Sequence, residues 1–407
     1  MTKHHRILSV NGGGVRGLVP AKIIEEIIKK AQKPIHELFD YVVGTSAGGL
    51  IAISLTVKDE NGNPKYSATD VVNIFKDDAQ KIFPPSYLDN IPALGNIMQL
   101  FTAKYSREGI DTLLESKLGN ATFLNTTIPI TTVSYSLDYD GPRLWSTYRA
   151  ENSPDTHNYL LKDAAGATSA APTFFPMKTT VSSAGKIFHD IDGGIFANSP
   201  TMIGITEFLK SNMLAKFKSL TVVSIGTGRF IDEPFYGQHV SNEDISYFGT
   251  ISGIGSAIPI LGTSVYYAHP IIGGVLAFTI AVSGILYDAY NGEGGIGLLT
   301  KKSLIDRMMK GTELSDAFQS KVAKVMRINP QLDKKYKSMD DSSTKHIQEF
   351  EQEIDIFIKK NSLTLDKVAG CLTSDNTDSD VCQDARSYTA HFDEDMHTKH
   401  EALWLHE

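Results

Sequence analysis

The sequence predicts an α/β domain with a largely parallel central sheet, and two observations support this fold class. Short apolar runs of strand length alternate along the chain with longer segments in which apolar residues recur at helical spacing. Strands that alternate with helices are typical of βαβ units, in which helices cover a parallel sheet. The length of 407 residues and the apolar content of 41% allow one large core with a modest appendage.

The expected strands are short apolar runs next to turn residues. They cover residues 6–10, 41–43, 128–135, 186–191 and 220–225. The clearest helix covers residues 18–31, where isoleucines on one face oppose Glu and Lys on the other. We expect this helix to pack on the sheet.

Two further helices are expected between residues 60 and 120. Ser67 with Asp70 resembles a capping box and predicts a helix through about Ala79. A helix over residues 106–118 is closed by Gly119. The apolar residues in this region either pack in the core or line a pocket; they are Phe83, Leu94, Ile97, Met98, Leu100 and Phe101.

Ser46 lies in the pentapeptide Gly44-Thr45-Ser46-Ala47-Gly48, directly after the expected strand at 41–43. The GxSxG pattern places a serine on a sharp turn between strand and helix, which makes Ser46 a candidate nucleophile. A side chain at Gly44 or Gly48 would clash with the helix or block a substrate carbonyl. Alone, the pattern also fits a plain turn.

A glycine-rich segment at residues 11–17 (Asn-Gly-Gly-Gly-Val-Arg-Gly) joins the first strand to the first helix. The amides of Gly12, Gly13 and Gly14, at the positive end of a helix, can converge on a small anion. Acyl transfer needs such donors, because the attacked carbonyl oxygen becomes negatively charged. A phosphate loop is the alternative, but neither a Walker lysine nor the full GxGxxG spacing is present.

Asp192 ends the expected strand at 186–191 and is followed by Gly193 and Gly194. A carboxylate within reach of a serine can accept its proton, and a partly dry pocket would raise the basicity of that carboxylate. An ordinary Asp-Gly turn is the competing interpretation.

The order GGGxRG, GxSxG about thirty residues later, and DGG well downstream resembles the signature of patatin-like phospholipases. The small-residue segment Ala167–Pro176 and the strand and turn at Val222–Gly228 are similar to further family elements. The resemblance runs from His5 to Gly228 and is loose beyond, at Met326–Pro330. Members commonly carry Asp before the three glycines, whereas this chain has Asn11, a change that we expect to be tolerated.

The resemblance implies a three-layer α/β/α sandwich with helical C-terminal elements and a lipid acyl hydrolase of the phospholipase A type. It implies a Ser46/Asp192 dyad that works through an acyl-enzyme, with no cofactor and no metal. The implied oxyanion hole is Gly12, Gly13 and Gly14. The implied supporting residues are Arg16, Gly44, Gly48, Gly193 and Gly194; Arg16 either steadies the loop or adds positive field.

Four alternatives stay open at this point. An acyltransferase or a general carboxylesterase would use the same site. A Ser-Asp-His triad would need a histidine, with His239, His269, His346 and His391 lying downstream of Asp192 and His189 expected to point to the opposite face of its strand. A catalytically silent lipid-binding protein would keep the fold without the chemistry.

The expected organisation has four parts: a catalytic core over 1–230, an uncharged apolar insert over 231–300, helical closing elements over 301–372 and a polar extension over 373–407. Within the insert, residues 245–287 contain no Asp, Glu, Lys or Arg. We expect this part to form a lid or a membrane-contacting wall, with plain burial or a dimer contact as the alternatives. A membrane span is disfavoured because Pro and Gly interrupt it.

The expected partner is a phospholipid or another acyl lipid, with peripheral membrane contact and without an assignable protein activator. The net charge of −8 argues against nucleic acid. Cys371 and Cys382 are expected to be free thiols, although they could pair with each other. The first residues contain no signal-peptide pattern, so a cytoplasmic protein is expected, and export by a specialised route stays open.

Overall fold

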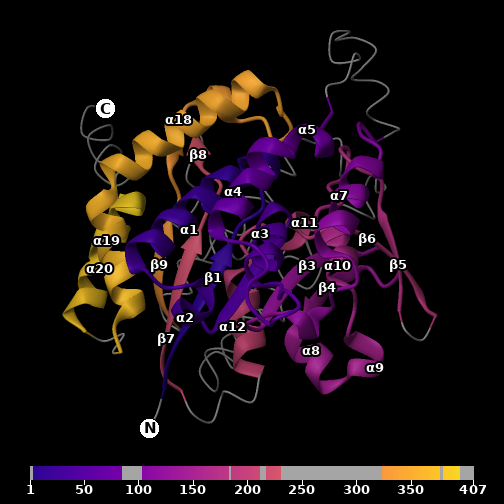
Figure 1. Cartoon of the computed structure of the whole chain (residues 1–407), viewed down its shortest axis with the longest axis horizontal. Helices are drawn as coiled ribbons and strands as arrows, with labels where there is room; N and C mark the ends of the chain where they lie inside the picture. Colours follow the sequence, from indigo (N-terminus) through magenta and orange to yellow (C-terminus); the bar gives the residue numbers. More distant parts are fainter. Residues whose placement is uncertain are drawn as a thin grey trace, which may run out of the picture.

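A mixed sheet lies at the centre of the computed structural model, which describes residues 3–84, 103–182, 185–210, 217–230, 323–375 and 379–394 (Figure 1). Within these residues the sheet has eight strands in the order β5-β6-β3-β2-β1-β7-β9, with β4 also paired to β3. The strands are β1 (Lys3–Val10), β2 (Tyr41–Thr45), β3 (Ile130–Ser136), β4 (Gly141–Ser146), β5 (Lys178–Val181), β6 (Ile187–Asp192), β7 (Phe217–Ile225) and β9 (Lys324–Ile328).

Pairing within the sheet is parallel from β3 through β2, β1 and β7 to β9, and antiparallel where β4, β5 and β6 join. This arrangement confirms the predicted α/β fold with a largely parallel sheet. A second, two-stranded sheet pairs β8 (Arg229–Phe230) with β10 (Gln331–Leu332).

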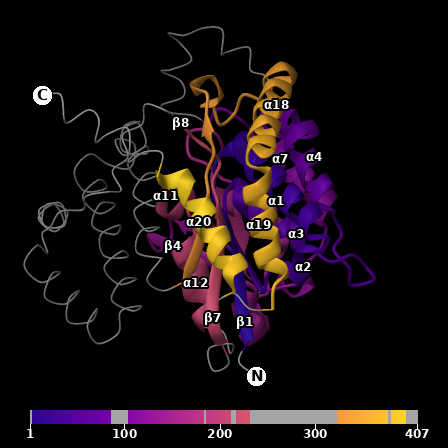
Figure 2. The same ribbon diagram turned by 90° about the vertical axis from the view of Figure 1, so that its left-hand side faces the viewer.

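Helices cover both faces of the sheet. The main helices are α1 (Leu18–Ala31), α3 (Ala47–Thr56), α4 (Ala68–Asp77), α7 (Glu108–Leu118), α10 (Leu161–Thr168), α12 (Thr201–Lys210), α18 (Thr344–Lys360), α19 (Ser362–Thr373) and α20 (Asp380–Glu394). The short ones are α2 (Ile35–Leu38), α5 (Ala79–Ile82), α8 (Thr147–Asn152), α9 (Pro154–His157) and α11 (Gly194–Ala197). Figure 2 shows α12 on one side of β1 and β7, with α1, α3 and α4 on the other.

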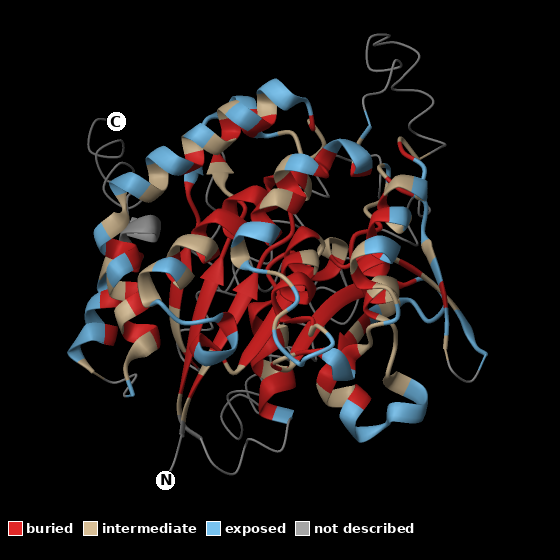
Figure 3. Ribbon diagram, in the orientation of Figure 1, coloured by how far each residue is buried: buried red, intermediate tan, exposed pale blue. Residues whose placement is uncertain are grey.

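The two-residue period of the strands divides the core into two parts. Leu8 and Val42 belong to the larger cluster that includes α1, α3 and α4, whereas Ile7, Tyr41 and Val43 pack with α12. The central strands are buried on both faces, as the red ribbon in Figure 3 shows. A strand buried on both sides reads as a continuous apolar run, which explains why residues 41–43 carry no alternation.

The expected elements lie within a few residues of the observed ones. Ser67 forms the predicted capping box, because the Asp70 amide donates to its hydroxyl at 3.1 Å and its own amide donates to the Asp70 carboxylate at 2.8 Å. The helix is shorter than predicted, since α4 ends at Asp77 and α5 follows as a separate turn. Gly119 caps α7 with a φ of 53°.

The C-terminal helices are attached to the core by charges as well as apolar contacts. Lys22 on α1 contacts Glu351 at 2.9 Å and Asp355 at 2.7 Å, both on α18. The polar extension was expected over 373–407. Its described part forms α20, which packs against α19 and β9.

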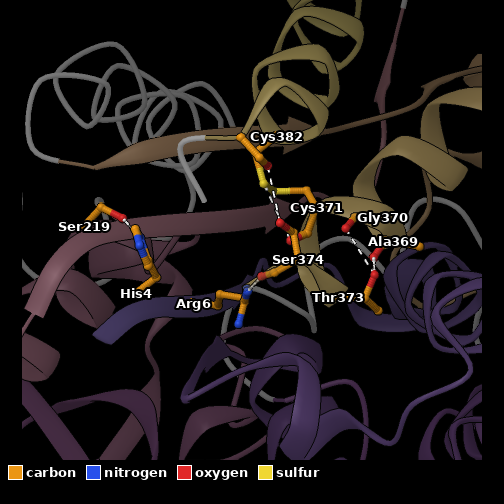
Figure 4. Close-up of a disulfide and its surroundings, with 10 residues drawn as sticks. His4, Arg6, Ser219, Ala369, Gly370, Cys371, Thr373, Ser374 and Cys382 are labelled. Atoms are coloured by element: carbon orange, nitrogen blue, oxygen red, sulfur yellow. Dashed lines mark hydrogen bonds between the residues drawn. A yellow bond between two sulfur atoms is a disulfide. The ribbon is translucent and has the colours of Figure 1, made fainter. Parts of the chain in front are cut away.

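Cys371 and Cys382 form a disulfide between α19 and the start of α20, with their Cα atoms 4.6 Å apart (Figure 4). The expectation of two free thiols is therefore wrong. The reason lies in the packing, because α19 and α20 form a helical hairpin whose facing sides bring the two residues together. The loop after α19 is also held by Arg6, whose guanidinium donates to the Ser374 carbonyl.

Several expectations concern residues outside the described ranges. These are most of the insert at 231–300, with the uncharged residues 245–287, and the pocket candidates Leu94, Ile97, Met98, Leu100 and Phe101. In the part of the chain that the structure does describe, no helix is both long and apolar enough to cross a bilayer.

Candidate active site

Ser46 occupies a strained turn between β2 and α3. Its backbone has φ 55° and ψ −126°, outside the regions that residues with a side chain normally adopt. Such strain costs roughly 1 to 3 kcal/mol and is concentrated at functional sites. The strand before and the helix after Ser46 supply the structural context that the GxSxG pattern requires.

The glycines on either side of Ser46 are required by close backbone contacts. A Cβ atom on Gly44 would lie 2.1 Å from the carbonyl oxygen of Gly48, and one on Gly48 would lie 2.2 Å from the carbonyl oxygen of Val10. No side chain fits at those distances, because neither neighbour is a movable side-chain end. The turn therefore brings β2 and α3 closer together than any other residue type would allow.

Thr168 supports the Ser46 turn with its hydroxyl group, a role that no sequence motif indicates. The Ser46 amide donates to the Thr168 hydroxyl at 2.9 Å, and that hydroxyl donates to the Val133 carbonyl of β3 at 2.5 Å. Thr168 lies in the small-residue segment 167–176, which is visible in the sequence. Its contact with Ser46 is visible only in the folded chain. The contact joins residues that are 122 positions apart.

Asp192 is the last residue of β6 and is 3% exposed. Its Oδ1 accepts the Gly194 amide at 2.7 Å, while its Oδ2 is buried without a hydrogen-bond partner within the described residues. Burial raises the pKa of Asp192 to about 7, although the neighbouring Ser46 hydroxyl and the Gly194 amide lower it. A carboxyl group with such a pKa can act as a general base near neutral pH.

Gly193 and Gly194 have different tasks in the Asp192 turn. A Cβ on Gly193 would lie 2.2 Å from the Val133 carbonyl oxygen, so Gly193 lets β6 turn against β3. Gly194 supplies the amide that orients the carboxylate. The Asp192 amide donates to the Ala170 carbonyl at 2.9 Å, which ties the turn to segment 167–176.

The glycine loop follows β1 and lies against Ser46. A Cβ on Gly12 would be only 2.9 Å from the Ser46 Cβ. The Gly12 amide donates to the Asn198 carbonyl at 3.1 Å and is therefore engaged within the protein. The amides of Gly13 and Gly14 have no hydrogen bond within the described residues and stay available to an anion.

Other groups fix the position of this loop. The Met339 carbonyl accepts the Val15 amide at 2.9 Å and would lie 2.1 Å from a Cβ on Gly14, whose φ is 59°. The Thr227 hydroxyl donates to the Gly12 carbonyl at 2.9 Å. No local pattern around Met339 or Thr227 points to this contact, because both approach the loop only in the folded chain.

The two remaining loop residues, Asn11 and Arg16, have structural contacts. The Asn11 carbonyl oxygen of the side chain accepts a hydrogen bond from Arg327 at 3.1 Å. Asn11 therefore acts as a side-chain acceptor that holds the loop. Arg16 is buried with its guanidinium 5.4 Å from the centre of the Phe230 ring, so its position favours the role of steadying the loop.

The histidines described near the core do not complete a triad with Asp192. His189 is directed to Asp138, with Nδ1 3.0 Å from its carboxylate, and His346 contacts Asp341 at 3.2 Å. His239, His269 and the side chain of His391 lie outside the described residues. Phe83, one of the pocket candidates, instead packs with Tyr105 and Phe175.

A largely parallel sheet that carries a serine on a strained strand-to-helix turn beside a buried aspartate defines a class of α/β proteins with a nucleophile-elbow site. Residues 8–205 match the family model described as patatin-like phospholipase. This part of the chain is therefore similar to the patatin-like phospholipase family, in agreement with the resemblance of its motifs.

Curated relatives agree with this assignment. Patatin-like protein 1 of Oryza sativa subsp. indica is 31% identical over a segment covering 56% of this chain and 60% of that protein. Patatin-like protein 1 of Arabidopsis thaliana is 33% identical, with 54% and 58% covered. The match thus spans about three fifths of these relatives. A third relative, at 26% identity with 54% and 62% covered, is named "Probable inactive patatin-3-Kuras 1" of Solanum tuberosum.

Among solved structures, VipD from Legionella pneumophila aligns over 99% of this chain and 86% of that chain. The TM-score is 0.31 and the sequence identity 12%, a similarity too low to transfer any feature.

Proposed function

We propose that this protein is a lipid acyl hydrolase that cleaves fatty-acyl esters of membrane phospholipids through Ser46 and Asp192. The observation that carries the proposal is the strained Ser46 turn next to the partner-free oxygen of a buried carboxylate. A buried polar atom without a partner costs roughly 1 to 3 kcal/mol, so it needs an explanation, and a catalytic base is one.

The proposed reaction begins when Asp192 accepts the hydroxyl proton of Ser46 as the serine oxygen attacks the ester carbonyl. The carbonyl oxygen becomes negative and accepts hydrogen bonds from the amides of Gly13 and Gly14. Asp192 then returns the proton to the departing alcohol, which leaves acyl-Ser46. In the deacylation step, Asp192 accepts a proton from water, and the resulting hydroxide attacks the acyl group. The fatty acid then leaves as Asp192 returns the proton to the Ser46 oxygen.

The apolar surroundings of α3 suggest a path for the acyl chain but, among the described residues, contain no preformed space of its size. A small apolar cavity lies between α3, α4, α5, α7 and α10, and its lining includes Leu50, Ile53 and Leu114. Leu50 is one helical turn after Ser46, since its amide donates to the Ser46 carbonyl at 3.0 Å. The cavity has a volume of only about 20 Å³, so an acyl tail would follow α3 away from the serine only if the side chains around it moved apart.

Peripheral contact with a lipid surface and a cytoplasmic location also belong to this proposal. Contact with a lipid surface rests on the uncharged residues 245–287. Replacing Phe278 and Ile280 with Asp should weaken liposome binding and leave hydrolysis of a short soluble ester nearly intact. Equal loss of both activities would mean that the segment belongs to the core.

The test of the reaction is an assay of the purified protein with a phospholipid, a monoacyl lipid and a neutral glyceride. We expect Ser46→Ala and Asp192→Asn each to reduce turnover by about 10³-fold or more, as for other members of a catalytic dyad or triad. Ser116→Ala and Asp155→Asn are matched controls on α7 and α9, outside the site, and should keep wild-type turnover.

Each outcome of this assay separates the proposal from its alternatives. Unchanged turnover in both site variants would remove the dyad. A product joined to an added acceptor alcohol would identify an acyltransferase. Turnover confined to short soluble esters would identify a general carboxylesterase. Lipid binding without any turnover would identify a catalytically inactive lipid-binding protein. The Solanum tuberosum relative carries the word "inactive" in its name.

A further inference from the structure

Asn198 lies at the point where the glycine loop, the serine turn and the aspartate turn meet. It follows α11 (Gly194–Ala197), the short helix that begins two residues after Asp192. Its backbone carbonyl accepts the Gly12 amide at 3.1 Å, so its main chain already joins the Asp192 turn to the glycine loop. No pattern in the sequence points to a role for this residue.

The side chain of Asn198 is also directed toward the site. A Cβ placed on Gly12 would lie 2.6 Å from Asn198 Oδ1 and 2.9 Å from the Ser46 Cβ, so the amide group and the serine border the same side of Gly12. A Cβ placed on Gly194 would lie 3.6 Å from the same Oδ1 and 3.1 Å from Asp192 Oδ1. The amide group is therefore next to both halves of the dyad.

This amide group has no structural partner in the part of the chain that the structure describes. Asn198 is 9% exposed, yet no hydrogen bond joins its side chain to a described residue. Neither polar atom of this amide is among the fully buried side-chain atoms that have no partner, so the amide keeps some access to solvent. An accessible amide group without a protein partner, next to the nucleophile, is available to a bound substrate.

We propose that the Asn198 side chain donates a hydrogen bond to the substrate carbonyl oxygen as that oxygen becomes negative, alongside the amides of Gly13 and Gly14. This inference rests on the proposed acyl hydrolase function. A neutral amide suits the position, because a carboxylate there would repel both the oxyanion and ionised Asp192. With the Gly12 amide engaged, the Asn198 side chain supplies the third donor that the three glycines were expected to supply.

The experiment compares Asn198→Ala and Asn198→Asp with the wild type on a soluble carboxylic ester, with Asn152→Ala as a control. Asn152 is an exposed asparagine on α8 whose side-chain amide donates to the Tyr148 carbonyl of the same helix. Loss of one oxyanion donor typically lowers kcat about 10²- to 10³-fold. We expect that loss in both Asn198 variants, a KM within about threefold of wild type, and an unaffected control.

A second measurement is the rate at which a fluorophosphonate labels Ser46, because its phosphoryl oxygen occupies the position of the oxyanion. This rate should fall in step with kcat in both variants. Asn198→Asp keeps the shape of asparagine, so a residue that only fills space would tolerate it. Wild-type labelling and kcat in Asn198→Asp would therefore overturn the inference, even if Asn198→Ala proved unstable.

The inference and the proposed function fail in different ways. Turnover that survives in Ser46→Ala removes both. Turnover that is lost in Ser46→Ala but stays within threefold of wild type in both Asn198 variants removes only the role of Asn198.

Discussion

The Asp192 side chain shows how its surroundings alter the chemistry of a single residue. Its carboxyl group is buried next to the Ser46 hydroxyl, and one of its oxygens accepts the Gly194 amide. Burial raises the pKa of Asp192 to about 7, although the Ser46 hydroxyl and the Gly194 amide act in the opposite direction. A base with a pKa near the working pH is both available and strong enough to accept a proton.

We predict that this pKa controls the pH dependence of turnover. The base must be ionised to accept the Ser46 proton, so kcat/KM on an uncharged soluble ester should rise about tenfold per pH unit below the pKa. The profile should level off above the pKa of Asp192, which is about 7. Initial rates between pH 5 and 9 measure it, and a flat profile over the acidic half would contradict the role of Asp192 as the base.

A second prediction concerns stability. The pKa of Asp192 is higher in the folded protein than in the unfolded chain, so the folded protein binds the proton more tightly. The free energy of unfolding therefore falls as the pH rises from the unfolded pKa of 3.8 to the folded pKa of about 7. Asp192→Asn cannot ionise, so it should be more stable than the wild type at pH 8. We expect the difference in free energy of unfolding to grow by at least about 1 kcal/mol between pH 5 and pH 8. Urea unfolding at both pH values measures it, and a constant difference would refute it.

At the scale of elements, the segment after β10 braces the proposed oxyanion hole. The Met339 carbonyl holds Val15, and the next residue, Asp340, accepts hydrogen bonds from the Lys104 ammonium at 2.7 Å and the Tyr105 hydroxyl at 2.8 Å. The Tyr105 amide in turn donates to the Phe174 carbonyl. The segment therefore connects the glycine loop to the small-residue segment that supports Ser46 and Asp192.

Asp340→Asn should loosen this brace. Hydrogen bonds to charged groups contribute about 1.5 to 3 kcal/mol, so we expect a loss of about that size in the free energy of unfolding. We also expect kcat to fall without a matching change in KM, because misplaced Gly13 and Gly14 amides affect mainly the transition state. The matched control is Asp341→Asn, the neighbouring and more exposed carboxylate. If both variants behaved alike, Asp340 would have no special role.

At the scale of the whole molecule, the order of the strands assembles the site. β1 and β2 are parallel neighbours, with Val10 opposite Gly44, so the glycine loop and the Ser46 turn leave the sheet at the same edge. Asp192 lies opposite Ser134 on β3, the strand on the other side of β2. The three motifs, far apart in the sequence, thus meet at adjacent positions in the sheet.

The disulfide between Cys371 and Cys382 leads to a prediction about the stability of the whole molecule. Replacing Cys371 and Cys382 with Ala together should lower the free energy of unfolding by about 2 to 3 kcal/mol, because the bond closes a short loop. Turnover should be unchanged, since the bond joins α19 to α20, away from the elements that carry the site. Urea unfolding with and without reductant measures the effect, and equal midpoints would refute it.

The same bond bears on location. Disulfides persist in oxidising compartments and are rare in the cytosol. Alkylation of the protein directly in lysed cells therefore tests the expected cytoplasmic location, because a protein that works in a reducing cytosol should show two free thiols.

The sequence alone determined the fold class and most strand positions, and it indicated Ser46, Asp192 and the glycine loop as the candidate site. These features are local: a buried parallel strand is an apolar run, a capping box is two residues three apart, and an elbow needs glycines at set positions. The uncharged insert was also visible in the sequence, although its residues lie outside those that the structure describes.

Only the tertiary structure decided which groups at the site have a bonding partner within the protein and which do not. The Gly12 amide is taken by Asn198, Thr168 supports Ser46, Met339 holds the loop, and the two cysteines are paired. Each of these facts joins a residue to a partner elsewhere in the fold. A hydrogen bond depends on distance and direction between two atoms, and neither quantity is encoded near the residue in the chain, so folding itself sets the number of donors around the serine.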